Sequence, residues 1–86
     1  MSDILTDMLA DLQATRPPIY DFERWQAWLA AVGQTVSAFP TVERRWACVV
    51  ILANDLCLAM PGLSLALAYN TLAHAVFTYE AVEGKR

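Results

Sequence analysis

Four prolines divide the 86-residue chain into four segments, each with apolar residues at helical spacing. The breaks fall at Pro17-Pro18, Pro40 and Pro61-Gly62. At each break proline removes a backbone donor and keeps the preceding residue out of the helical region. The stretch 63–69 alternates like a strand, but it is rich in alanine and continues at helical spacing. The sequence therefore predicts an all-α fold, with helices over about 3–14, 22–39, 42–60 and 63–82 and a frayed tail at 84–86.

A chain of this length forms one compact domain, residues 1–86, with a single core. Hydrophobic residues make up 57% of it and charged residues 17%. Because a domain of this size leaves much of its surface exposed, the high apolar fraction indicates apolar surface outside the core, which is typical of an interface.

The net charge of −3 opposes binding to phosphate backbones, so we expect no direct nucleic-acid ligand. Arg24-Trp25 and Arg44-Arg45-Trp46 could in principle stack on bases. With so few basic residues in an acidic chain, packed tryptophans with exposed arginines are the favoured interpretation. The first twelve residues are acidic and amphipathic, unlike a secretory signal, and this indicates a cytoplasmic protein.

The first two predicted helices each have one apolar side, and segment 22–39 has the clearest stripe. Gly33 falls at the edge of that stripe, where we expect it to loosen the helix without breaking it. In segment 3–14 the residues Asp3, Asp7 and Asp11 follow at intervals of four and form one acidic ridge. A solvated face is the plainer interpretation of this ridge, and docking to a basic surface is the functional one.

The last two helices are instead apolar on two sides. Their main rows are Trp46, Val49, Val50, Ala53, Leu56, Cys57 and Met60 in the third, and Leu65, Tyr69, Leu72, Val76 and Tyr79 in the fourth. Their second rows are Ala47, Ile51, Asn54 and Leu58 in the third, and Leu63, Leu67, Asn70, His74, Phe77 and Ala81 in the fourth. Only Asp55 is formally charged between Trp46 and Tyr79. This predicts that the third and fourth helices form a central hydrophobic hairpin covered by the first two.

Two interpretations of the second rows stay open. The other helices could cover these rows inside a monomer. Alternatively the rows face another chain, with Asn54, Asn70 and His74 fixing the register as isolated polar groups do in coiled-coil seams. We favour the second interpretation, because polar groups are easier to satisfy at a wet interface, and a two-fold symmetric homodimer is its default form.

Metal, cofactor and catalytic signatures are weak in this sequence. His74 is the single histidine and has no cluster of cysteines or carboxylates at ligand spacing, so we expect no metal site and no cofactor. Cys48 and Cys57 lie too far apart on one helix to form a disulfide. One of the two cysteines could act as a nucleophile together with His74 and Asp55, so a minimal cysteine-dependent enzyme is a further alternative.

These observations predict a non-enzymatic protein-interaction module, a small acidic regulator, inhibitor or adaptor that binds a larger protein. In size and charge the chain resembles the small inhibitors that phages use against host systems, such as anti-CRISPR proteins. A membrane-associated helical hairpin is the main alternative, because residues 56–79 are uncharged. Pro61, Gly62 and several polar residues interrupt that stretch, which disfavours a membrane span.

Overall fold

The computed structural model describes residues 4–18 and 21–83, and this part of the chain is helical with short connections. The helices are α1 (Ile4–Ala14), α2 (Phe22–Ser37), α3 (Val42–Ala59) and α4 (Leu65–Glu83). The all-α, four-helix fold expected from the sequence is confirmed. Asp3 and the tail 84–86 lie outside the described residues.

A polar side chain precedes three of the helices and fixes where each begins. Asp21, Thr41 and Ser64 each accept a hydrogen bond from the backbone N–H three residues later. Each bond satisfies a donor that the first turn of a helix leaves unpaired. Because Ser64 is such a cap, α4 begins at Leu65, two residues after the expected start.

The last turn of α2, just before Pro40, has hydrogen bonds between residues three apart. The backbone N–H groups of Ala38 and Phe39 bond to carbonyls three residues earlier, and α2 ends at Ser37 rather than at residue 39. Pro40 follows, and a residue before proline is disfavoured in the helical region. Phe39 is nevertheless buried, so the turn closes one end of the core.

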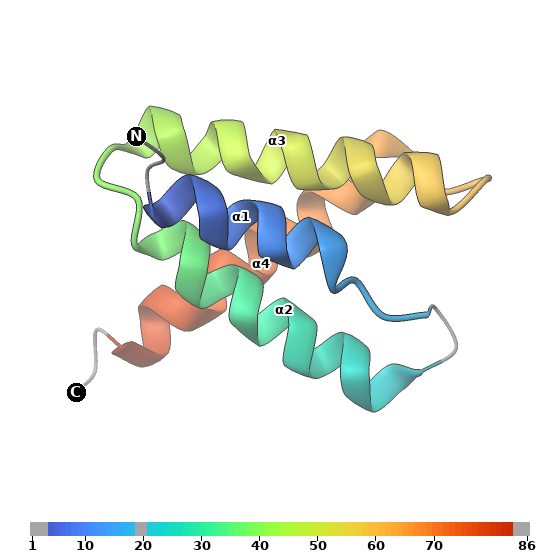
Figure 1. Cartoon of the computed structure of the whole chain (residues 1–86), viewed down its shortest axis with the longest axis horizontal. Helices are drawn as coiled ribbons and strands as arrows, with labels where there is room; N and C mark the ends of the chain where they lie inside the picture. Colours follow the sequence, from blue (N-terminus) through green and yellow to red (C-terminus); the bar gives the residue numbers. More distant parts are fainter. Residues whose placement is uncertain (1–3, 19–20, 84–86) are drawn as a thin grey trace.

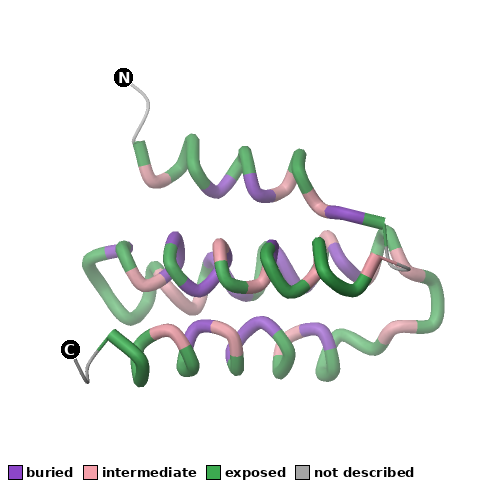
Figure 2. The backbone as a smooth tube through the Cα atoms, turned by 90° about the horizontal axis from the view of Figure 1, so that it is seen from below, coloured by how far each residue is buried: buried purple, intermediate pink, exposed green. Residues whose placement is uncertain are grey.

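The helices form three layers, with α2 and α3 between α1 on one side and α4 on the other (Figures 1 and 2). α3 and α4 pack on each other as the predicted hairpin, and α4 makes its most extensive contact with α2. α1 packs on both α2 and α3. One long side of α4 is thereby turned away from the rest of the molecule (Figure 2).

Gly33 is a packing residue rather than a weak point at the edge of a stripe, which corrects the expectation from the sequence. It is buried where α2 meets α4. A Cβ atom at this position would lie 2.7 Å from the carbonyl oxygen of Ala75 and 2.9 Å from the Cβ atom of Tyr79. The missing side chain therefore lets the two helix backbones come close together.

The core includes Val49, Ala53, Leu56, Leu72 and Val76 of the predicted main rows, and on α3 it extends further around the helix to Cys48 and Leu52. Val50 and Leu65 were expected in the core but are exposed. The buried residues of these two helices are Cys48, Val49, Leu52, Ala53, Leu56, Ala68, Leu72, Ala73 and Val76. Because both helices are apolar on two sides, periodicity did not show which side would meet α2; the packing of the other helices decides it.

Candidate functional site

Most of the predicted second rows lies on the surface of the folded chain, although Leu63 is half-buried against the core. The exposed members on α3 (Ala47, Ile51, Asn54 and Leu58) are called the α3 row, and those on α4 (Leu67, Asn70, His74 and Phe77) the α4 row. Every one of the eight interface residues predicted from the sequence is exposed: Ala47, Ile51, Asn54, Leu58, Leu67, Asn70, His74 and Phe77. The four large apolar members keep exposed fractions of 43% (Ile51), 85% (Leu58), 56% (Leu67) and 54% (Phe77). The other helices do not cover these rows, so the interpretation that places them inside the monomer core is wrong.

The polar members of the two rows differ in how they are satisfied. The side-chain amide of Asn54 donates to the carbonyl of Val50 in its own helix at 3.0 Å. Thr71, beside the α4 row, similarly donates to the carbonyl of Leu67 at 2.8 Å. Across the described residues no protein group hydrogen-bonds the side chain of Asn70 or of His74. Both therefore have donors and acceptors available to water or to another molecule.

Trp46 of α3 contacts two aromatic side chains of α4. Its ring stacks on Tyr69 with centroids 5.9 Å apart and meets the edge of Phe77 at 5.6 Å. Tyr69, Ala73 and Phe77 follow at intervals of four on α4, so they lie along one side of that helix.

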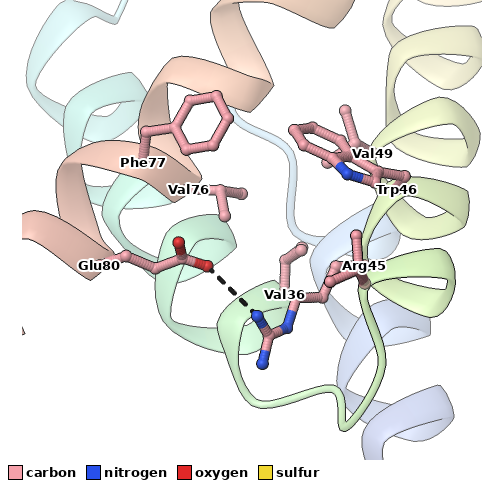
Figure 3. Close-up of a pocket in the computed structure, with 8 residues that line it drawn as sticks. Val36, Arg45, Trp46, Val49, Val76, Phe77 and Glu80 are labelled. Atoms are coloured by element: carbon pink, nitrogen blue, oxygen red, sulfur yellow. Dashed lines mark ion pairs between the residues drawn. The ribbon is translucent and has the colours of Figure 1, made fainter.

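A pocket of about 140 Å³ opens next to this aromatic cluster, where α2, α3 and α4 meet (Figure 3). Val36, Val49 and Val76 form its apolar wall, and Trp46 and Phe77 border it on the outer side. An apolar cavity of similar volume in another protein admits a benzene ring. The pocket is therefore large enough for one apolar side chain of a partner.

The rim of the pocket carries an ion pair between α3 and α4 that is hydrogen-bonded to the end of α2. A terminal guanidinium nitrogen of Arg45 lies 3.7 Å from Oε1 of Glu80 (Figure 3). Nε of Arg45 donates to the carbonyl of Phe39 at 2.9 Å, and Ser37 donates to the Glu80 carboxylate at 3.4 Å. Sequence reasoning missed this pocket, because it depends on how three separate segments pack and no local motif encodes it.

The acidic ridge borders a shallow groove between α1 and α2. Asp7 and Asp11 are exposed and line the groove together with the apolar side chains of Ile4 and Met8. Asp3, the third predicted member, is outside the described residues. The two described carboxylates therefore flank apolar surface instead of standing on a purely polar face.

The residues of the remote catalytic alternative lie on different faces. Cys48 is buried and Cys57 half-buried, and both are free thiols. Burial raises the pKa of the Cys48 thiol, although the nearby Arg44 guanidinium partly lowers it. Asp55 accepts a hydrogen bond from Gln13 of α1, whereas His74 is exposed on α4 beside the groove to α2. The structure thus does not assemble the cysteine, histidine and aspartate into one site.

The tryptophans of the two arginine-tryptophan motifs pack against other groups. Trp25 meets Trp28 edge to face and donates through Nε1 to the carbonyl of Pro18. Arg24 pairs with Asp21, and the Arg44 guanidinium lies 5.1 Å from the centroid of the Phe39 ring. The expectation of exposed arginines next to packed tryptophans holds for Arg24 and Arg44, whereas Arg45 is half-buried and bonded to the Phe39 carbonyl.

Neither a membrane span nor a metal cluster is found in the described part of the chain. None of its helices combines the length and the apolar character that crossing a bilayer requires. Among residues 4–18 and 21–83, His, Cys, Asp and Glu side chains do not gather in groups that could hold a metal ion. No family model matches the sequence, and no curated protein or solved structure shows significant similarity to it.

Proposed function

We propose that this protein is a non-enzymatic interaction module, a small acidic regulator, inhibitor or adaptor that acts by binding another protein. The observation that carries the proposal is the exposure of the eight interface residues predicted from the second rows on the folded chain. Contiguous exposed apolar surface is typical of protein-binding sites, whereas isolated exposed apolar residues are ordinary. We therefore place binding on two exposed rows, one along α3 and one along α4.

The aromatic pocket supports this assignment. Binding energy in protein interfaces concentrates in a few anchors that enter well-packed recesses. Phe77 belongs to the α4 row and also borders the pocket between α2, α3 and α4. A partner covering the row can place one apolar side chain in that recess, and its polar groups can contact Arg45 and Glu80 at the rim.

The acidic ridge provides a second contact in this proposal. Asp7 and Asp11 flank the apolar groove between α1 and α2, and complementary charge mainly speeds association and selects among partners. Replacing both with lysine should leave the helix content unchanged and weaken capture of a basic partner. Unchanged capture would mean that these carboxylates only solvate the domain.

The α3 row provides the test of the proposed function. Tagged wild-type protein is used to capture partners from cells that carry its gene, in parallel with Leu58→Glu and a control, Phe22→Glu. Leu58 and Phe22 are similarly exposed, at 85% and 71%, but Phe22 lies at the start of α2, away from the rows. We expect a stoichiometric partner with wild type and Phe22→Glu and its loss with Leu58→Glu. Equal capture by all three, with circular dichroism showing folded proteins, would contradict the proposal.

A further inference from the structure

We propose that the α4 row binds a second copy of this chain, with the two α4 helices antiparallel and Asn70 facing His74 of the partner subunit. The inference rests on the proposed function, because it takes the exposed rows to be binding surfaces. It goes further by naming the occupant of one row and the residues that meet. The α3 row then stays available for a different protein, and the partner whose side chain enters the pocket beside Phe77 is the second copy.

The spacing of the α4 row fits an antiparallel pair. Leu67, Asn70, His74 and Phe77 follow at intervals of three, four and three, a pattern that reads the same in both directions. A two-fold axis at the middle of the row therefore places Asn70 opposite His74 of the partner subunit. It also places Leu67 opposite Phe77 of the partner subunit. Polar then meets polar and apolar meets apolar, as an isologous interface requires.

A parallel pair would be less complementary. Its two-fold axis would run along the helices and set each residue opposite its own copy. His74 would face His74 of the partner subunit, so the amide and the imidazole would lose their match. The antiparallel arrangement instead forms the Asn70–His74 contact twice, once on each side of the axis.

The hydrogen-bonding state of these side chains favours the same pairing. In residues 4–18 and 21–83 no protein group bonds the side chain of Asn70 or His74, whereas Asn54 of the α3 row is already bonded to its own helix. A carboxamide and a neutral imidazole each offer a donor and an acceptor, so they can satisfy one another. Two reciprocal polar contacts inside an apolar row would fix the register, as isolated polar residues do in coiled coils.

The absence of charge on this part of α4 and the outer position of the helix also favour a second copy as the partner. α4 has no formally charged residue from Leu65 to Tyr79, although the whole chain has a net charge of −3. Two copies can therefore meet along this row without like charges facing each other, and the row offers no charge by which to select a basic or acidic partner. α4 is also an outer layer of the molecule, with its exposed side turned away from the other helices (Figure 2).

The exposed apolar area of the row is modest. Phe77 is 54% exposed, and a fully buried aromatic side chain covers about 150–250 Å², so Phe77 leaves on the order of 100 Å² to a partner. A specific dimer buries about 600–1,000 Å² on each copy, so residues that flank the row must be covered as well. A dimer built on so short a row should dissociate on dilution.

The first measurement is solution mass by light scattering over a dilution series from about 100 to 1 μM, a range suited to modest affinities. We expect wild type and the control Phe22→Glu to be dimers at the high end, and Leu67→Glu to be a monomer with unchanged helix content. A wild-type monomer at about 100 μM would overturn the inference. The proposed function would survive that result if Leu58→Glu still abolished partner capture, so the two failures are distinguishable.

Disulfide trapping tests the orientation. In a Cys57→Ala background, Leu67→Cys and Phe77→Cys proteins are prepared separately, then oxidised alone and as a mixture. Because the antiparallel pair sets these two positions opposite each other, we expect the mixture to form a covalent heterodimer at least ten times faster than either protein alone. Equal or faster trapping in the single proteins would indicate a parallel or random encounter and would overturn the antiparallel assignment.

Discussion

Gly33 of α2 lies directly against the backbone of α4 at Ala75. A Cβ atom on Gly33 would lie 2.7 Å from the Ala75 carbonyl oxygen, and neighbouring Tyr79 would be almost as close. Backbone cannot move aside as the end of a flexible side chain can, so α2 and α4 would have to separate. Their contact is the most extensive between any two helices of the described chain, and Gly33 is therefore required for it.

Gly33→Ala should destabilise the protein by about 1–3 kcal/mol, the usual cost of overpacking a well-packed site. Alanine is more favourable in a helix than glycine by about 1 kcal/mol. Helix propensity alone therefore predicts that Gly33→Ala stabilises the protein. Urea unfolding of wild type and variant measures the difference, with the exposed α2 position Ala30→Gly as the propensity control. A stabilised Gly33→Ala protein would show that the helices do not approach this closely.

The two partners of the rim ion pair should differ in their effect on stability. Glu80→Gln removes a partly exposed ion pair and should cost less than about 1 kcal/mol. Arg45→Met also removes the charged donor to the Phe39 carbonyl, and bonds to charged groups contribute about 1.5–3 kcal/mol. Arg45→Met should therefore be the more destabilising change, with thermal unfolding as the readout. Raising the salt concentration should reduce the effect of Glu80→Gln, and equal losses for both variants would contradict the assigned role of Arg45.

The buried thiol of Cys48 should make stability fall at alkaline pH. Burial raises the pKa of this thiol in the folded protein, against the weaker opposing effect of Arg44. The contribution of the protonated Cys48 thiol to the free energy of unfolding is therefore complete below the ordinary thiol pKa of about 8.5. It is lost as the pH rises through the higher pKa of the folded protein. Urea unfolding from pH 7 to 10 should show a steeper fall for wild type than for Cys48→Ala. Parallel pH profiles would contradict this.

The same burial predicts unequal reactivity of the two cysteines. Half-buried Cys57 should react first with a thiol reagent in the native protein, and Cys48 should react mainly after unfolding, since the thiolate is the reactive form. Peptide mass spectrometry after timed labelling distinguishes the two. Labelling of Cys48 as fast as Cys57 would mean that the core around α3 opens readily.

Sequence periodicity was sufficient for the four helices and for much of the core, but it did not decide whether the second rows were core or surface, nor how far around α3 the core extends. Asp21, Pro40 and Pro61 carry local signals, so the helix ends were predicted to within about two residues. Val50 and Leu52 are both apolar and lie on different sides of α3, and only the way the other helices pack on α3 determines that Leu52 is the buried one. The Trp46 pocket was missed for the same reason, because three segments distant in sequence must meet to form it.

The attachment of α1 depends on one buried hydrogen bond from Trp28. Its indole Nε1 donates to the carbonyl of Leu12 at 2.9 Å, and this carbonyl belongs to the last turn of α1, where helix acceptors lack partners in the helix. Trp28→Phe keeps a ring in the core but leaves that buried acceptor unpaired, which should cost about 1–3 kcal/mol. Trp25→Phe is the matched control, because its bond to the Pro18 carbonyl is exposed and water can replace it. Hydrogen exchange should show faster exchange in α1 for Trp28→Phe than for Trp25→Phe. Equal protection of α1 would mean that its apolar contacts and the Gln13–Asp55 hydrogen bond hold it in place without the indole.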